Sequence, residues 1–445
     1  MDWTEQHVRR LFWRAGFGAT PEEATHWAAA GRKATLRWVL DGTPGAKLAG
    51  PAPVVNGKPL DPLNEWGHDG LWWIDRMIRS PRPLVEKLTL FWHDHFATAD
   101  QDTPLMLAQN RMLRRYGLGR FRALLGHVAR DPAMQLFLSL TDNDKDAPNE
   151  NFARELMELF TLASGYTERD IREAARALTG WQGKWDDNGF HGIVYVADRH
   201  DSGIKRVLGK RGRLGTDDVL DLVCAHPRHA PYLTRKLWDF FVTRPPDAAT
   251  ARRLVAVYRA GGGHVKPVVA EILGHPLLYA DLDAPDMVKA PVVLLAGHLR
   301  TAGAGITTDS YTWLLSLMGQ QLFSPPSVAG WEWGPAWLTT NSVGARFTLA
   351  NYLLRADADS PGPLPVPDGT GDPKLTAADQ VDTALDALGR PWISASSRQT
   401  LVDLAAGFYA DLVKPWEIKT KPQRADMLQR VLRHLVLTGP DAHLH

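Results

Sequence analysis

The sequence predicts a mainly α-helical protein: a multi-helical globular bundle with a small β-hairpin inserted near residues 183–215. Signals for helix starts recur along the chain, and apolar residues return at helical spacing over residues 84–96 and 152–160. The helical pattern breaks at 183–215, where strand-favouring residues alternate. Residues 190–196 and 205–208 are expected to pair there as the two strands of the hairpin.

The helix starts are the clearest local signals. In Thr20-Pro21-Glu22-Glu23 the threonine takes the N-cap position, proline the first helical position and glutamate the third. The segments 167–170 and 376–379 repeat this arrangement with aspartate at the third position. Side chains at these positions bond the free N–H groups of a first turn, so each segment predicts a helix that begins one residue after the threonine.

The chain divides into three helical stretches. Residues 1–40 hold N-terminal helices, residues 63–358 form a helical core that carries the hairpin insert at 183–215, and residues 376–445 form a C-terminal helical segment. Connections rich in proline and glycine separate the three stretches.

Composition and charge exclude several classes of function. The 445 residues contain 51 Lys and Arg against 50 Asp and Glu, so no basic field would hold a nucleic acid. The single cysteine, Cys224, excludes an internal disulfide framework and any site built from several cysteines. No apolar run approaches the ~18 residues of a membrane span. No signal peptide is visible, which predicts a cytoplasmic protein as written, or an exported one if a leader has been removed.

The segment Pro148 to Phe160 carries the strongest functional signal. Read as a regular helix, it has one apolar stripe and, beside it, a row of one amide and two carboxylates. Such a row near a buried edge is costly to bury unless arginines, a metal ion or a substrate pair with it. The apolar stripe consists of Phe152, Leu156, Leu159 and Phe160, and the polar row of Asn151, Glu155 and Glu158.

Two histidines end the preceding apolar helix, in Trp92-His93-Asp94-His95-Phe96. On a regular helix His93 and His95 point about 200° apart and cannot bind one ion. They share a side if the chain is extended near His93. Otherwise His95 is a buried, hydrogen-bonded side chain and His93 a solvated one.

The loop His200-Asp201-Ser202-Gly203-Ile204-Lys205 follows the first predicted strand. A His-Asp pair at the end of a strand, followed by glycine and lysine, is typical of a ligand-binding or acid–base site on a loop. An exposed loop with a capping aspartate is the equal alternative.

The segment Ser324 to Trp337 contains Trp331, Trp333 and Trp337, held by prolines. A stiff aromatic loop of this kind stacks on flat or sugar-like ligands, or on a partner protein. A loop that folds as a lid onto the helical core is the alternative.

Common catalytic motifs are absent from the sequence. It contains no G-x-S-x-G, G-x-x-x-x-G-K-[ST] or H-E-x-x-H, so the serine hydrolase, P-loop NTPase and zincin classes have no support. The acidic turn 142–146 lacks the glycine and glutamate spacing of an EF-hand.

Together these motifs resemble the uncharacterised bacterial family called domain of unknown function 1800. The resemblance runs from about residue 7 to about residue 355, in the same order, and the residues from about 376 onward match less well. It rests on residues 14–18, 91–96, 148–162, 165–167, 177–181, 200–205, 207–209, 226–227, 235–237 and 320–331.

The family has no established activity to carry over. Its members look mostly exported, and their genes often neighbour those of a sulfatase-like family, domain of unknown function 1501. The resemblance therefore implies a protein partner from that sulfatase-like family, and it implies export, although this sequence lacks the usual leader.

The first hypothesis is a metal-dependent hydrolase that acts on a glycan or ester-like substrate. The sequence leaves the cofactor open, and a divalent metal ion is the candidate because the family motifs supply nitrogen and oxygen ligands. The metal would activate water, and Glu155 or His200 would move protons. The metal ligands would be His93, His95, Asn151 and Glu155, the catalytic residues Glu155, His200 and Asp201, and the substrate-binding residues Arg154, Lys205, Trp331 and Trp333.

The alternative is a non-catalytic helical partner protein. In it Arg154, Arg172 and Arg176 neutralise the two glutamates, the histidines cap helices, and the Trp331 loop is the docking surface. A non-covalent haem protein is a third hypothesis, since a helical chain rich in histidine could hold a haem, and no C-x-x-C-H motif would attach it.

Overall fold

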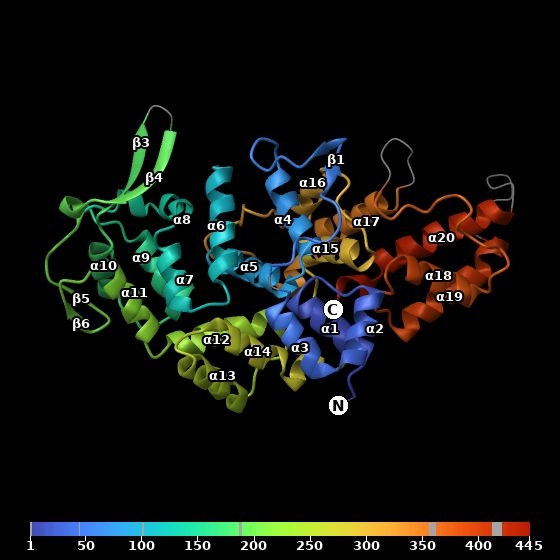
Figure 1. The fold of residues 1–445 in the computed structure, drawn as a ribbon, viewed down its shortest axis with the longest axis horizontal. Coiled ribbons are helices and arrows are strands. Elements are labelled where there is room, and N and C mark those ends of the chain that lie inside the picture. The colour runs from blue at the N-terminus through green and yellow to red at the C-terminus, as the bar shows by residue number, and fades with distance from the viewer. Residues whose placement is uncertain (1, 44, 100–101, 187–188, 356–361, 412–420) are drawn as a thin grey trace. The chain divides into compact units, whose positions relative to one another are not determined.

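The computed structural model describes residues 2–43, 45–99, 102–186, 189–355, 362–411 and 421–445. Within these ranges the chain is mainly helical, with small two-stranded antiparallel sheets, which confirms the predicted fold class (Figure 1). None of the described helices combines the length and the apolarity needed to cross a bilayer.

The chain forms two compact units. Unit 1 contains residues 1–84, 276–321 and 332–445, and unit 2 contains residues 85–275 and 322–331. Unit 1 therefore contains residues from all three helical stretches predicted from the sequence, 1–40, 63–358 and 376–445. The predicted boundary at residue 358 lies outside the described residues.

Unit 1 is built around α15 (Pro291–Thr301), in which every residue is buried. A helix that is apolar on nearly all sides is expected to have neighbours on all sides. α4 packs against α15, α2 and α3 pack on α1, and α17, α18 and α19 contact α20. The other elements of unit 1 are α1 (Glu5–Ala15), α2 (Pro21–Ala30), α3 (Arg32–Asp41), β1 (Val54–Val55), β2 (Lys58–Pro59), α4 (His68–Arg79), α16 (Ser310–Leu317), α17 (Thr340–Leu354), α18 (Ala377–Ala387), α19 (Ala395–Asp411) and α20 (Lys421–Thr438), with short 3-10 helices at Pro276–Tyr279, Gly334–Trp337 and Pro440–His443.

Unit 2 contains most of α5 (Pro83–His95), a helix whose polar side chains are largely buried and paired. One of them, Glu86, is bonded by Arg114 at 2.9 Å. α12 (His229–Phe241) contacts three helices and a π-helix at Leu156–Leu162. The other elements are α6 (Thr103–Tyr116), α7 (Phe121–Val128), α8 (Pro132–Phe137), α9 (Asn151–Glu155), α10 (Glu168–Ala177), α11 (Thr216–Ala225), α13 (Ala248–Ala260) and α14 (Val265–Leu273), with short 3-10 helices at Leu140–Asp142 and Ala197–Arg199.

The insert at 183–215 contributes to two hairpins rather than one. β3 (Trp181–Asp186) pairs with β4 (Gly189–Tyr195), and β5 (Lys205–Val207) pairs with β6 (Lys210–Gly212). The predicted pairing of 190–196 with 205–208 is therefore wrong. Leu208 and Gly209 have φ angles of 46° and 85°, which close a two-residue turn, so β5 pairs with the strand that follows it.

Candidate functional site

The segment with the strongest sequence signal is not a regular helix. α9 passes directly into the π-helix Leu156–Leu162, which ends where Ala163 adopts a φ of 62°. A π-helix has a wider turn than an α-helix and is frequent at functional sites. The wider turn changes the predicted stripes: Phe152, Leu156 and Phe160 are buried as expected, but Leu159 is only half-buried, and Met157 and Thr161 are buried in addition.

Side chains from two other helices bond the last carbonyl groups of the π-helix. Nε2 of His95 donates to the Phe160 carbonyl at 3.0 Å, Nδ1 of His229 donates to the Thr161 carbonyl at 3.2 Å, and the Tyr232 hydroxyl donates to the Leu159 carbonyl at 2.5 Å. Carbonyl oxygens only accept, so these contacts fix which ring nitrogen of each histidine carries hydrogen. His95 of α5 and two residues of α12 thus satisfy the free carbonyls of this helix end.

His95 is a neutral group in an aromatic surrounding. Burial, and to a smaller extent the charge of Lys236, lower the pKa of His95 well below its ordinary value. Nζ of Lys236 lies 3.5 Å from its Nδ1, and Phe91, Trp92 and Phe96 flank the ring. Burial also lowers the pKa of Lys236, and the charge of Asp94 opposes that effect.

His93 and Asp94 fasten the segment 322–331 to the end of α5. Nε2 of His93 accepts from the backbone N–H of Phe323 at 3.1 Å, and Oδ1 of Asp94 accepts from that of Trp331 at 2.8 Å. Gly330 makes this contact possible, because a Cβ there would lie 2.3 Å from Asp94 Oδ1. Burial lowers the pKa of His93 to about 3, so this ring is neutral and not solvated as one alternative had it.

The tryptophan segment folds back onto the helices. Trp331 is 6% exposed and its ring lies 5.5 Å from that of His93, so little of the indole is accessible to a ligand. Trp333 belongs to unit 1, is half-buried, and contacts Trp337 edge to face. The predicted substrate-stacking role of these two indoles stays a prediction, and the lid alternative describes Trp331 better.

The four predicted metal ligands do not form one group. Among the residues that the structure describes, no three His, Cys, Asp or Glu side chains are placed to hold a metal ion. His93 and His95 each direct a ring nitrogen to a backbone group, and Asn151 lies exposed at the start of α9. The metal site therefore gains no support, because separate backbone contacts use the groups that were expected to converge.

The His200 loop is held by bonds within the fold. Nδ1 of His200 donates to the Thr179 carbonyl at 3.0 Å, and Asp201 accepts from Arg176 at 2.6 Å. Burial alone would raise the pKa of Asp201, but the bond from Arg176 lowers it below its ordinary value. The buried Lys205 donates to the carbonyls of Asp201, Gly203 and Leu214. These bonds shape the loop, and the predicted acid–base and binding roles of His200, Asp201 and Lys205 stay predictions.

Glu155 and Glu158, here called the acidic edge, differ from the other candidates. Within the described residues neither carboxylate makes a hydrogen bond or an ion pair. Arg154 was expected to neutralise them, but it bonds Glu150 at 3.2 Å and Glu168 at 2.9 Å. Arg176, the second expected partner, bonds Glu173 and Asp201.

Burial and neighbouring charge perturb the groups around the acidic edge. Burial and the neighbouring charge of Glu158 raise the pKa of Glu155, which is half-buried. The pKa of Tyr166 is raised by burial and by Glu158, and burial, Tyr166 and Glu158 raise the pKa of Tyr232 to about 12. A carboxyl group with a raised pKa, beside a second carboxylate and two phenols, is typical of a site for proton transfer.

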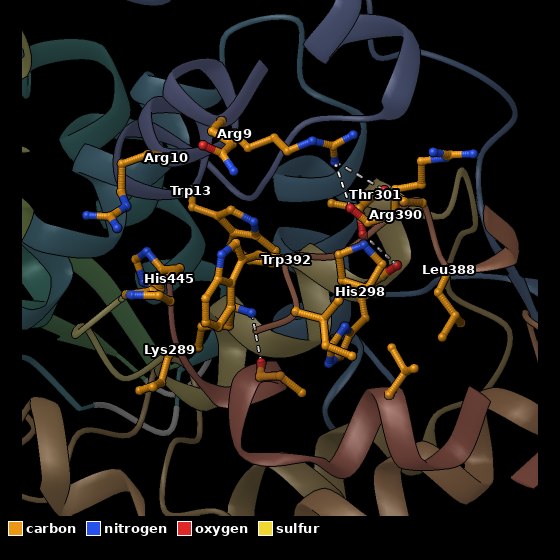
Figure 2. A pocket seen from close by; sticks show the side chains of 18 of the residues that line it. Arg9, Arg10, Trp13, Lys289, His298, Thr301, Leu388, Arg390, Trp392 and His445 are labelled. Atoms are coloured by element: carbon orange, nitrogen blue, oxygen red, sulfur yellow. Dashed lines mark hydrogen bonds between the residues drawn. The ribbon is translucent and has the colours of Figure 1, made fainter. Parts of the chain in front are cut away.

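Sequence reasoning missed a pocket in unit 1. It has a volume of about 270 Å³ and lies between residues of α1, the segment 282–289, α15, the segment 388–393 and the segment 436–445 (Figure 2). The only signal in the sequence is the density of basic residues in α1, where Arg9, Arg10 and Arg14 follow one another closely.

These features define a multi-helical protein with a largely buried π-helix whose last carbonyl groups are bonded by His95, His229 and Tyr232. Residues 10–441 match the family model described as Protein of unknown function (DUF1800), so the chain belongs to this family. No curated protein and no solved structure matches it.

Proposed function

We propose that the chain is a hydrolase of glycan or ester-like substrates and that Glu155 is its proton donor. The observation that carries the proposal is the placement of Glu155, a half-buried carboxyl group near Glu158 to which no arginine among the described residues is bonded. Burial and the charge of Glu158 raise its pKa, and the charge of Arg154 opposes them. The proposal does not include the metal ion that the sequence suggested, because its four predicted ligands do not lie together.

The chemistry follows from the charge of the acidic edge. Burial and the charge of Glu158 both favour the protonated form of Glu155, so that Glu155 can donate its proton to the leaving oxygen as the scissile bond breaks. Water supplies the hydroxyl to the other fragment and returns a proton to Glu155. Tyr166, half-buried and electrostatically coupled to Glu158, offers an aromatic side for a sugar or an acyl group.

Replacing Glu155 with glutamine tests the proposal. The wild-type protein should hydrolyse at least one member of a panel of p-nitrophenyl glycosides and short-chain p-nitrophenyl esters. Glu155→Gln should lower kcat about 100-fold or more, the usual contribution of a positioned acid.

Glu150→Gln is the matched control. Glu150 lies one turn earlier and is bonded by Arg154, so this variant should keep the wild-type rate. A folded wild-type protein that turns over no member of the panel would contradict the proposal, and so would a Glu155→Gln variant as fast as the wild type.

A second candidate function is the partner protein for the sulfatase-like family. A specific observation favours it: unit 1 exposes large apolar side chains that include Trp66 at 70% and Trp313 at 48%. The residues next to these two tryptophans are in contact: Thr312 Oγ1 donates to the Gly67 carbonyl at 3.3 Å. Exposed indoles close together mark a surface for protein contacts.

Co-purification tests this candidate. A tagged chain should retain a sulfatase-like protein of the family called domain of unknown function 1501, and the double variant Trp66→Ser, Trp313→Ser should lose it. Trp185→Ser, in which an indole that is 62% exposed is removed from unit 2, should bind as the wild type does. Equal retention by the double variant, or none by the wild type, would exclude the surface.

A further inference from the structure

The pocket of unit 1 is cationic. Its lining contains Arg9, Arg10, Lys289 and Arg390, and it contains no aspartate or glutamate among the described residues. Figure 2 shows these side chains around the indoles of Trp13 and Trp392. The two outer arginines have carboxylate partners beyond the lining, Glu5 for Arg9 and Asp386 for Arg390.

The two inner cations have only neutral hydrogen-bonding partners, although carboxylates lie near enough to act on both through their charge. Lys289 is 4% exposed; its Nζ donates to the Ala442 carbonyl at 2.8 Å and lies 4.2 Å from the centre of the Trp13 ring. Arg10 is 7% exposed and donates to three carbonyl groups, the nearest that of Asp281 at 3.0 Å. In the part of the chain that the structure describes, neither forms an ion pair.

A third cation adds to the positive potential. The buried Arg346 donates to the carbonyls of Lys289 and Trp337 at 2.9 and 3.2 Å. Burial, and the charge of Arg346, lower the pKa of Lys289 to about 7. Buried charges whose hydrogen-bonding partners are all neutral are costly, and an anion bound beside them would offset that cost.

The remaining walls are flat and apolar. Trp392, Leu388, Ile393 and Val436 line the pocket. Trp13 is held in place because it packs on Gly297, where a Cβ would lie 2.1 Å from the indole. The volume of about 270 Å³ lies below the ~300–1,000 Å³ of sites that enclose drug-sized ligands, so the occupant is small.

We propose that this pocket binds a small organic anion, a molecule with a flat apolar body and one carboxylate or similar acidic group. The acidic group faces the Lys289 end, where no carboxylate among the described residues forms an ion pair with Lys289, and the flat body lies against Trp392 and the aliphatic wall. The site lies in unit 1 and does not depend on the role of Glu155.

Calorimetric titration with three probes tests the inference. 2-Naphthoate has both the ring and the charge, 2-naphthamide has the ring alone, and inorganic phosphate has the charge alone. The wild-type protein should bind 2-naphthoate at least about tenfold more tightly than either of the others, the effect of one charge-assisted contact in a buried site.

Two variants locate the site. Lys289→Met should remove the preference for naphthoate over naphthamide, and Trp392→Ala should weaken the binding of both. Arg398→Ala serves as the control, because Arg398 is on α19, pairs with Asp382 and is not part of the lining. Trp392→Ala keeps every cation of the pocket, so it stays informative if the Lys289 variant does not fold.

Three results would overturn the inference. The first is equal affinity of the wild type for naphthoate and naphthamide, or no binding of either. The second is tighter binding of phosphate than of naphthoate, which would indicate a site for an inorganic ion. The third is unchanged naphthoate binding in folded Lys289→Met and Trp392→Ala.

Discussion

Buried imidazoles in this protein act as neutral hydrogen-bonding groups. His229 donates from Nδ1 to the Thr161 carbonyl, and its Nε2 accepts from the Tyr258 hydroxyl at 2.8 Å. Burial lowers the pKa of His229 to about 4, and that of His443 also to about 4. In the unfolded chain a histidine titrates near ~6.5, so the unfolded state binds more protons than the folded state below that pH.

Acid should therefore destabilise the fold in a window set by these residues. The stability supplied by neutral His229 is present above pH 6.5 and is lost as the pH falls toward 4. Its loss amounts to on the order of 3 kcal/mol. His229→Gln keeps a donor and an acceptor but cannot titrate, so the variant should lose less stability between pH 7 and 4, as measured by urea unfolding.

His26→Gln provides the control for that comparison, because His26 is exposed. Its free energy of unfolding should depend on pH as that of the wild type does. Identical pH dependence of His229→Gln and the wild type would show that His229 is not held neutral.

Among the elements, helix starts could be predicted from the sequence because their causes are local. Thr20, Thr167 and Thr376 each form the expected capping box, and the helices begin at the next residue. Each box needs only four consecutive residues, so no knowledge of tertiary structure was required.

The π-helix could not be predicted, because its cause lies elsewhere in the chain. Buried residues at 152, 156 and 160 fit an α-helix and a helix that widens after Glu155 equally well. Bonds from His95, His229 and Tyr232 satisfy the widened end, and these residues are about 65 or more positions away. The pairing of β4 was predicted wrongly for a different reason. The turn that pairs β5 with β6 is local, but Gly209 was its only signal in the sequence, and Leu208 is unusual at a positive φ.

At the scale of the whole molecule, the sequence identified the polar row of the candidate site but not its pairing. Glu155 and Glu158 could be identified from their positions in the sequence alone. The ion pair between Arg154 and Glu168, in contrast, depends on how α9 packs against α10. The unit 1 pocket was invisible, because it assembles Trp13, Lys289 and Trp392 from three distant parts of the chain. The sequence thus identifies polar residues in unusual positions, and the tertiary structure determines which of them have no ion-pair partner.

The central claim is that Glu155 is the catalytic acid and that the charge of Glu158 adds to burial in raising its pKa. It is tested most directly by the pH dependence of kcat/KM on the best substrate of the panel, for the wild type and for Glu158→Gln. Removing the charge of Glu158 should lower the pKa of Glu155, so the alkaline limb, where the acid loses its proton, should move to lower pH in the variant. An alkaline limb at the same pH in both proteins would contradict the claim.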